Sequence, residues 1–197
     1  MHFLKTGFYL DQRVTRSRVR QLVGRDQHLL DVFSYTGATG INAAVAGARV
    51  TCIERDEAAL ALGKENAQLN GVADRMEFIA ADAFYWLEHT AASGKRSAWI
   101  SLDPPGLAKS RQEIQGARRA LHHLLVHGLR ALEPSGQLLL SLCTYHILGL
   151  AEEIVRIAAG DDGARLRVRD HWLQADDHPW VLQIPATRYL ASWLLGR

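Results

Sequence analysis

Four places along this chain carry residue types that could do chemistry, and each follows a short apolar segment. A run of small and hydroxyl residues (34–40) follows the first segment, and a carboxylate, Glu54, ends the second. An acid before two prolines, Asp103, follows a later segment, and Cys143 follows another. Open α/β sheets place their reacting groups at the carboxyl ends of the strands. We therefore expect these four places to face one cleft.

The turn at 34–40 and Glu54 together predict a nucleoside pocket. A glycine-bearing turn lets the backbone approach a ligand, and an acid at the tip of the next strand accepts hydrogen bonds from two ribose hydroxyls. The turn contains Gly37 and Gly40, but it has Tyr35 where a pyrophosphate-binding G-x-G-x-x-G fingerprint needs its first glycine. This composition favours a nucleoside without a diphosphate over NAD. S-adenosylmethionine is the leading candidate.

Size and composition indicate one enzyme-like domain that covers residues 1–197. The chain is 48% hydrophobic, so it can bury a core, and its length does not demand two domains. A formal charge of +2 gives no global polycation that would force a nucleic-acid function. Cys52, expected in the core, and Cys143 are too few for a disulfide framework. With no signal peptide and no membrane-spanning apolar run, we expect a cytoplasmic protein without a membrane partner.

Strand and helix patterns alternate along almost the whole chain, which predicts a mostly parallel sheet with helices on both faces. Strands are expected at 29–33, 49–53, 76–80, 99–102, 137–142, 166–172 and 189–195. Helices are expected at 12–23, after Gly40, at 56–70, at 112–132 and beyond Leu148, and a Pro-Ser-Gly turn at 134–136 should separate the fourth helix from its strand. The predicted fold class is therefore α/β, a single Rossmann-like domain. Its seven-stranded sheet should close as a hairpin with an antiparallel last strand.

Several motifs resemble those of a known enzyme family. The segments are Lys5-Thr-Gly-Phe-Tyr-Leu-Asp-Gln-Arg13, Phe33-Ser-Tyr-Thr-Gly37, Asp103-Pro-Pro105, Ser141-Leu-Cys-Thr144, Ala175-Asp-Asp-His-Pro179 and Tyr189-Leu190. They resemble the class I S-adenosylmethionine-dependent methyltransferases, and within them the catalytic domain of bacterial large-subunit ribosomal RNA methyltransferases that make 5-methylcytosine. That family carries an RNA-binding module before its Lys-Thr-Gly segment. This chain begins at Met1, so we expect the catalytic domain without that module.

The resemblance implies S-adenosylmethionine as the cofactor and names the residues that hold it. An N-terminal segment, residues 1–27, would cover the cofactor, with Arg13 at the methionine carboxylate and Asp11 at the ammonium. Asp82 would accept a hydrogen bond from the adenine amino group. The predicted cofactor-binding set is Thr6, Gly7, Phe8, Asp11, Arg13, Phe33, Ser34, Tyr35, Thr36, Gly37, Glu54, Arg55, Asp82, Ala83, Asp103 and Pro104.

Some of these side chains also have a purely structural interpretation. Asp82 could cap the helix that follows it, and this role is compatible with adenine binding. The other N-terminal arginines, Arg16, Arg18 and Arg20, are expected on a solvated helix face. Arg13 is instead expected to contact the cofactor or the site.

The acceptor side of the cleft admits two chemistries. An exocyclic amine acceptor needs a carbonyl or carboxamide, and such enzymes usually follow the prolines with an aromatic ring, which this chain lacks. Cytosine C5 needs instead a thiolate that adds at C6 and an acid near N3. Asp103 is predicted as the acid and Cys143 as the thiol, activated by His146 or Lys109. The alternative for Cys143 is a small buried hydrophobe.

Pro105, Lys109 and His178 are the predicted substrate contacts, His178 because its loop is shared with the family. A metal site is not expected. Although His123 and His127 are spaced i,i+4 on one predicted helix, no Cys or Glu is expected to complete a zinc set.

Three functions follow from these residues. The first is a methyltransferase acting on C5 of a cytosine in RNA, which the resemblance implies is ribosomal. The second is a methyltransferase of a small molecule or a heteroatom acceptor, without covalent catalysis. The third is a non-catalytic cofactor- or partner-binding domain, against which Glu54, Asp103 and Cys143 argue. The partners considered are therefore RNA or a small-molecule acceptor, together with a homodimer.

Overall fold

The computed structural model describes residues 7–108 and 110–197, so the predicted site residues Thr6 and Lys109 lie outside the described part of the chain. One sheet has the strand order β3-β2-β1-β4-β5-β7-β6. Its strands are β1 (His28–Val32), β2 (Arg49–Glu54), β3 (Met76–Ala80), β4 (Ser97–Leu102), β5 (Leu132–Leu142), β6 (Arg167–Leu173) and β7 (Ala191–Gly196). The pairs from β3 to β5 are parallel, whereas β7 runs antiparallel to both β5 and β6. The predicted fold class is confirmed.

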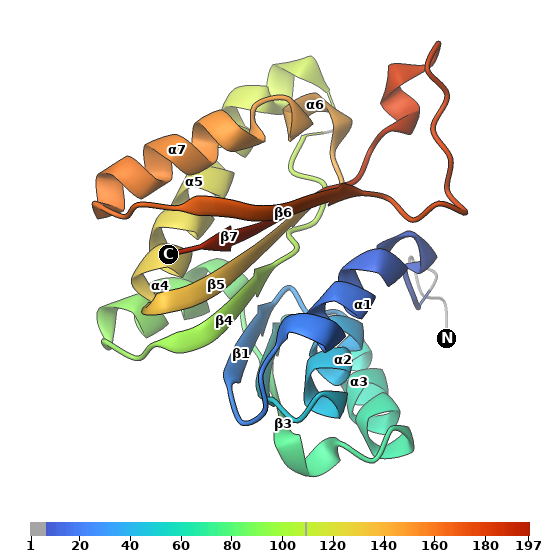
Figure 1. The fold of residues 1–197 in the computed structure, drawn as a ribbon, viewed down its shortest axis with the longest axis vertical. Helices are drawn as coiled ribbons and strands as arrows, with labels where there is room; N and C mark the ends of the chain where they lie inside the picture. The colour runs from blue at the N-terminus through green and yellow to red at the C-terminus, as the bar shows by residue number, and fades with distance from the viewer. Residues whose placement is uncertain (1–6, 109) are drawn as a thin grey trace.

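Helices cover both faces of this sheet, with α1, α2 and α3 on one side and α4, α5 and α7 on the other (Figure 1). The helices are α1 (Arg13–Leu22), α2 (Ala38–Val45), α3 (Glu57–Leu69), α4 (Ala83–Ala92), α5 (Ile114–Arg130), α6 (Tyr145–Leu148) and α7 (Ala151–Asp162), with short 3-10 turns η1 (Leu10–Gln12), η2 (Ala73–Arg75), η3 (Arg111–Glu113) and η4 (Pro185–Thr187). We name the two sides the α1 face and the α5 face. Within the described residues, no helix is both long and apolar enough to cross a membrane.

The central strands are buried on both faces, and alternate residues supply two separate cores. In β1, Leu30 and Val32 pack in the cluster of the α5 face, while Leu29 packs in the cluster of the α1 face. The same alternation divides β4 between Ile100 on the α5 face and Trp99 on the α1 face. The strands are therefore fixed in register by two layers of helices, and their carboxyl ends form one edge.

One predicted turn was wrong in its placement. The Pro-Ser-Gly segment at 134–136 does not precede the strand but lies within the bounds of β5. Leu132 pairs with Ser97 and Gln137 with Trp99, so β5 carries extra residues between these two pairs. Pro134 has no N–H to donate, and such residues are tolerated where a ladder is interrupted. The turn signal therefore marks an irregularity inside the strand.

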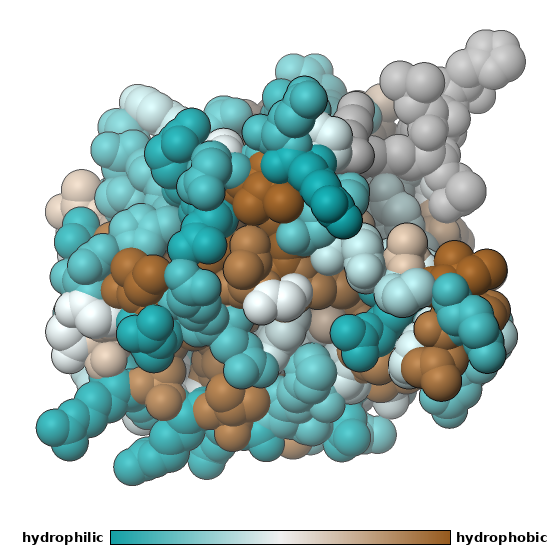
Figure 2. All heavy atoms as spheres, turned by 90° about the horizontal axis from the view of Figure 1, so that it is seen from above, coloured by the Kyte–Doolittle hydropathy of each residue, from teal (hydrophilic) through white to brown (hydrophobic). Residues whose placement is uncertain are grey.

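The connection between β6 and β7 extends away from the body of the molecule (Figure 1). Four large apolar side chains in it are exposed: Trp180, Val181, Leu182 and Ile184. Seen from above, apolar atoms are visible at the centre of the face and again at its right-hand edge, the side on which this connection lies (Figure 2). Because β6 and β7 meet at this connection, it projects beside the carboxyl ends of β4 and β5.

Candidate functional site

A cavity of about 480 Å³ lies at the carboxyl ends of the strands. The predicted site residues that line it are Phe8, Asp11, Phe33, Ser34, Tyr35, Thr36, Glu54, Arg55, Asp82, Ala83, Asp103, Pro104, Pro105 and Cys143. Four described residues that were predicted for the site do not line it: Gly7, Arg13, Gly37 and His178. Three residues of the segment expected to cover the cofactor, Tyr9, Gln12 and Arg16, also line it. Asp31, Phe84, Gly106 and Tyr189 line it without having been predicted there. The four places singled out in the sequence therefore do meet in one cavity.

The loop after β1 holds two bulky residues in a backbone conformation that normally favours glycine. Phe33 has φ 65° and Tyr35 has φ 50°, and Gly37 follows with φ 74°. Left-handed backbone at bulky residues costs free energy and persists where the surroundings impose it, which often marks a ligand site. Tyr35 thus adopts a glycine-like backbone although it replaces a glycine of the nucleotide fingerprint.

Glu54 ends β2 and its carboxylate is oriented by backbone N–H groups. Oε2 accepts a hydrogen bond from Tyr35 N at 3.1 Å, and Oε1 accepts from Arg55 N at 2.9 Å and Asp56 N at 3.1 Å. These bonds fix the carboxylate against the loop. Oε2, which accepts only one of these bonds, keeps acceptor capacity for a ligand hydroxyl.

Asp82 caps α4 as the structural interpretation predicted. Its Oδ1 accepts hydrogen bonds from Phe84 N at 3.0 Å and Tyr85 N at 3.1 Å. The side chain also lines the cavity, beside the edge-to-face pair formed by the rings of Phe33 and Phe84. Both predicted roles are therefore compatible with its position.

The N-terminal segment is fastened onto the loop after β1. Gly7 N donates to the Tyr35 hydroxyl at 3.1 Å, and the Thr36 hydroxyl donates to the Gly7 carbonyl at 3.2 Å. The ring of Tyr9 lies 5.6 Å from that of Tyr35. Burial is the main cause that raises the pKa of Tyr9 to about 12, and its neighbours in the cavity add to the shift. Gly7 therefore positions the loop from outside the cavity.

Asp11 joins the N-terminal segment to the C-terminal part of the chain. Its Oδ2 accepts a hydrogen bond from the Tyr189 hydroxyl at 2.7 Å, and its carbonyl accepts from Ala175 N at 3.0 Å. Burial and this carboxylate raise the pKa of Tyr189, so Tyr189, like Tyr9, stays neutral near pH 7. The second oxygen of Asp11, Oδ1, is buried with no hydrogen-bond partner among the described residues.

The prediction for Arg16 was wrong, because this side chain is buried and not solvated. It is 7% exposed, donates to the Tyr9 carbonyl at 2.6 Å and lies 4.1 Å from the centre of the Phe8 ring. Burial lowers its pKa, and Asp11 opposes that shift. Arg13 points the other way and pairs with Asp177 at 3.2 Å. Arg16 lies four residues after Gln12, so the two side chains lie on the same side of the helix. Arg13, three residues before Arg16, does not share that side.

Asp103 and Cys143 follow the neighbouring strands β4 and β5 and line the same cavity. Asp103 Oδ2 accepts a hydrogen bond from Gln12 Nε2 at 2.9 Å, and Gln12 is only 8% exposed. Cys143 is exposed, with Sγ 3.9 Å from the Pro104 carbonyl, so the buried-hydrophobe alternative fails for this residue. Cys52 is fully buried in the α1-face cluster, as predicted.

Asp31 is a buried cavity residue that the sequence analysis missed. It is 2% exposed, and its Oδ2 accepts a hydrogen bond from Gly40 N at 3.0 Å. Burial raises its pKa to about 6, while hydrogen bonds from Ser101 and Gly40 oppose the shift. Gly40 permits this contact, because a Cβ there would lie 2.9 Å from Val50 Cγ1. A charged residue inside an otherwise apolar strand was the signal that could have revealed it.

Two histidines predicted near the reaction lie elsewhere. His178 Nδ1 is 3.0 Å from Asp177 Oδ1, outside the cavity lining. The ring of His146 lies 5.7 Å from that of Tyr145 and lines a second cavity. Thr144, which precedes Tyr145 and His146 in the chain, has its hydroxyl 3.3 Å from the place that a Cβ would occupy at Gly106. The Asp-Pro-Pro-Gly segment therefore packs directly against the residue after Cys143.

The expectation that no Glu would join His123 and His127 was wrong. Glu88 of α4 lies beside His123 and His127 of α5, and one ligand atom from each falls within 4.8 Å of the others. His123 Nε2 and Glu88 Oε2 are 3.9 Å apart. The glutamate comes from a different helix, so its position could not be deduced from spacing.

Comparisons with known proteins agree with this architecture. The chain is 33% identical over 192 residues to ribosomal RNA large subunit methyltransferase I of Klebsiella pneumoniae, covering 96% of this chain and 48% of that protein. It is 36% identical to the Aeromonas salmonicida protein of the same name, covering 94% of this chain and 48% of that one. The chain thus spans about half the length of the curated relatives it matches.

Among solved structures, SMU.776, described as a putative methyltransferase complexed with SAH, superposes with a TM-score of 0.88 at 21% identity, covering all of this chain and 52% of that one. A putative SAM-dependent methyltransferase from Streptococcus mutans gives 0.85 at 20% identity, covering all of this chain and 51% of its own. These likenesses establish the class I methyltransferase fold. The family described as Conserved hypothetical protein 95 matches residues 13–129, and this chain belongs to it.

Proposed function

We propose that this chain is a methyltransferase domain that uses S-adenosylmethionine to methylate C5 of a cytosine in RNA through an adduct on Cys143. The observation that carries the proposal is the exposed thiol of Cys143, which lines one cavity with Asp103 and Glu54. The ribosomal RNA methyltransferases that resemble the chain support RNA as the acceptor class. S-adenosylmethionine supplies the methyl group as a reactive sulfonium.

The cavity residues fit this cofactor chemically. Glu54 faces the cavity with its carboxylate held by three N–H groups, and it accepts the ribose hydroxyls. Asp82 uses Oδ1 as a helix cap, which leaves Oδ2 for the adenine amino group. The buried acceptors Asp11 Oδ1 and Gln12 Oε1 suit the ammonium, and the buried guanidinium of Arg16 suits the carboxylate.

On the acceptor side, Cys143 acts as the nucleophile and Asp103 as the acid. The thiolate of Cys143 forms a bond to C6, the electrons of the ring shift toward N3, and Asp103 delivers a proton to N3 and then accepts its hydrogen bond. C5 becomes an enamine-like carbon that accepts the methyl group. A base then removes the C5 proton, the C5–C6 double bond reforms, the thiolate leaves and N3 returns its proton.

Cofactor binding is tested by calorimetry with S-adenosylhomocysteine on Glu54→Ala. Loss of ribose hydrogen bonds to a charged acceptor should weaken binding by about 2–4 kcal/mol. Glu57→Ala, an exposed acid on α3, is the matched control and should bind as the wild type does. Equal affinity in the Glu54→Ala variant would remove this residue from the site.

The adduct is tested with large-subunit ribosomal RNA that contains 5-fluorocytosine. Fluorine at C5 cannot leave as a cation, so the complex should stay covalent and survive denaturation. Cys143→Ala should lose both trapping and methylation, whereas Cys52→Ala should still trap because its thiol is buried outside the cavity. A Cys143→Ala variant that methylates at the wild-type rate would point instead to an acceptor that needs no covalent catalysis.

A further inference from the structure

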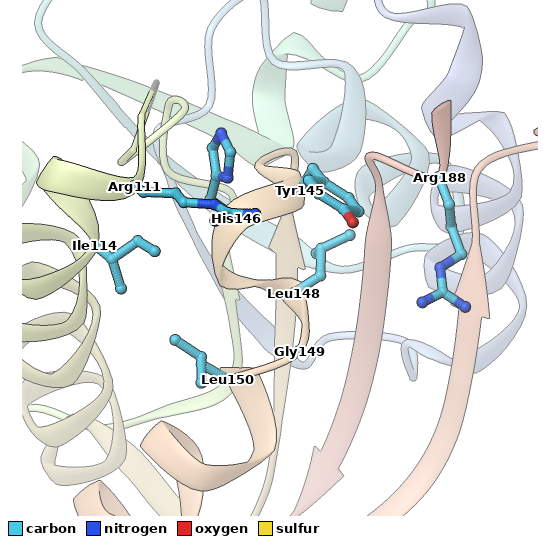
Figure 3. A pocket seen from close by; sticks show the side chains of 8 residues that line it. All are labelled: Arg111, Ile114, Tyr145, His146, Leu148, Gly149, Leu150 and Arg188. Atoms are coloured by element: carbon cyan, nitrogen blue, oxygen red, sulfur yellow. The ribbon is translucent and has the colours of Figure 1, made fainter. Parts of the chain in front are cut away.

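The described residues also line a second cavity, of about 420 Å³. It is lined by Arg111, Ile114, Tyr145, His146, Leu148, Gly149, Leu150 and Arg188. Figure 3 shows that these residues come from separate segments, with Arg111 and His146 near one another on one side and Arg188 on the other. Tyr145 lies between them, and Leu148 points toward its ring.

The lining of this cavity is cationic and aromatic. Arg111 and Arg188 are both exposed, and no Asp or Glu is among the described lining residues. Within the described part of the chain, neither guanidinium takes part in an ion pair. Arg188 lies 5.4 Å from the centre of the Trp180 ring, and Tyr145 is 40% exposed. Such a lining suits an anionic group beside a flat ring.

The segment that carries Arg188 is held by hydrogen bonds to the buried side chain of Gln174. Gln174 is 7% exposed, donates to the Thr187 carbonyl at 2.7 Å and accepts from Leu190 N at 3.4 Å. The Thr187 hydroxyl donates to the Ile184 carbonyl at 2.7 Å. Because Thr187, just before Arg188, and Leu190, two residues after it, are both held, a ligand would not need to order this backbone.

Residues that are close together in the sequence line the two cavities. Cys143 lines the first and Tyr145 the second, two residues later, which is at most about 7 Å of extended chain. Arg188 lines the second and Tyr189 the first. A polynucleotide with its target base at Cys143 would therefore pass its neighbouring nucleotide over the second cavity.

We propose that the cavity between α6, η3 and the residues before β7 binds the nucleotide next to the methylated base, an inference that rests on the proposed RNA methyltransferase function. Arg111 and Arg188 bind its phosphate groups, and Tyr145 stacks on its base. A cationic groove interleaved with aromatic rings is how proteins hold single-stranded RNA whose bases are unstacked. Chemistry on a base requires it to leave the stack, which exposes its neighbour to such a site.

The test uses a fluorescent single-stranded RNA of about 20 nucleotides that contains cytosines. The double variant Arg111→Ala/Arg188→Ala should bind it at least about 10-fold more weakly. The slope of log affinity against log salt should fall by about 1.4, because each phosphate contact on a single strand contributes about 0.7. Affinity for S-adenosylhomocysteine should not change. Arg96→Ala, an exposed arginine that precedes β4 and so lies at the opposite edge of the sheet, is the matched control.

Separate outcomes would overturn this inference and the function on which it rests. If the wild type binds and methylates RNA but the double variant binds equally well, the cavity inference is wrong and the function stands. If the wild type binds S-adenosylhomocysteine but no RNA, both are wrong. Should the variant be unfolded by circular dichroism, 4-thiouridine crosslinking of the wild type decides, since the expected crosslink is at Tyr145. Equal displacement of the RNA by polyglutamate would indicate an acidic protein partner instead.

An independent observation concerns the cluster of Glu88, His123 and His127. It joins α4 to α5 on the α5 face, and His123 and His127 present their rings 4.3 Å apart between centroids. His127 Nδ1 is buried and has no hydrogen-bond partner among the described residues. Two imidazoles and a carboxylate form a donor set that zinc and similar transition metals prefer.

We infer that this cluster binds a divalent transition metal that clamps α4 to α5, with water completing the coordination. After treatment with EDTA, added Zn²⁺ should bind at one equivalent and raise the melting temperature, because it binds only the folded protein. His123→Ala and His127→Ala should each lose this response. His122→Ala is the control, because that ring instead contacts Asp161 at 2.8 Å. Zinc binding of equal affinity in His123→Ala, or no binding by the wild type, would overturn the inference.

Discussion

The two faces of the sheet are built from the same strands but differ in polarity. On the α5 face, residues such as Leu30, Leu102 and Leu140 are completely or almost completely buried in one continuous apolar cluster. On the α1 face, Asp31, Ser101, Ser141 and Ser192 interrupt a smaller cluster and are themselves at most 2% exposed. The apolar cluster of the α5 face stabilises the fold. The α1 face buries less apolar surface, and its polar side chains make contacts that hold the N-terminal segment.

Polar contacts on the α1 face lead directly to the cavity. The Ser141 and Ser192 hydroxyls are 2.8 Å apart, and Ser192 is 3.3 Å from the hydroxyl of Thr15 in α1. Trp172 Nε1 donates to that same hydroxyl at 2.9 Å. Thr15 precedes Arg16 and lies one turn from Gln12, so this network fixes the helix that carries two cavity side chains. The difference between the faces is therefore a difference between stabilising the fold and positioning the site.

Removal of a large side chain from the α5 face should give the largest effect on stability. Leu140→Ala deletes a fully buried side chain in that cluster and should lower the free energy of unfolding by about 2–5 kcal/mol, from lost burial plus a cavity. Urea denaturation measures the loss. Affinity for S-adenosylhomocysteine below the transition should hardly change, and a large drop in it would show that the faces are not separate in function.

The next largest expected effect is a pH dependence of stability caused by Asp31 on the α1 face. Its pKa in the folded protein, about 6, is above the ordinary value of 3.8, so the folded state holds a proton that the unfolded state releases first. The protonated Asp31 carboxyl is therefore accommodated at no cost below about pH 4, and the folded state loses stability as the pH rises through 6 and the buried carboxyl must ionise. Each unit corresponds to about 1.4 kcal/mol, so the cost at neutral pH is about 3 kcal/mol.

Asp31→Asn removes that titration but keeps an acceptor for Gly40 N. We therefore expect the unfolding free energy of the variant, relative to the wild type, to rise by about 3 kcal/mol between pH 4 and pH 7. Urea denaturation across this range measures it. Parallel pH profiles for the two proteins would mean that Asp31 does not titrate differently on folding.

Gln12 tests whether the α1 face positions the reaction. Gln12→Ala removes the bond to Asp103 and should cost about 0.5–1.5 kcal/mol in stability. If Gln12 positions Asp103, the maximal methylation rate should fall about 10-fold, equivalent to about 1.4 kcal/mol in the barrier. Gln21→Ala, an exposed glutamine near the end of the adjoining helix α1, is the matched control. A loss of stability with an unchanged rate would make Gln12 purely structural.

Much of this arrangement could be predicted from the sequence because it depends on local patterns. Apolar segments separated by turn residues located all seven strands, and an acid after such a segment identified Glu54 and Asp103 as facing one edge. The sequence could not separate Arg13 from Arg16, because both lie in the first turn or two of α1 and only packing against the sheet decides which is buried. Gln12 and Glu88 were missed for a related reason, since their partners come from elements far away along the chain.

The smallest expected effect comes from the seam between Ser141 and Ser192. Ser192→Ala removes a hydroxyl that contacts both Ser141 and Thr15, but each of these retains rotational freedom, and Thr15 keeps its bond from Trp172. The expected loss is about 1 kcal/mol. In a double-mutant cycle, Ser141→Ala should cost little once Ser192 is already alanine, because the two hydroxyls share one interaction. Additive losses would show that the hydroxyls act independently, and the α1 face would then lack the connected polar seam that distinguishes it from the α5 face.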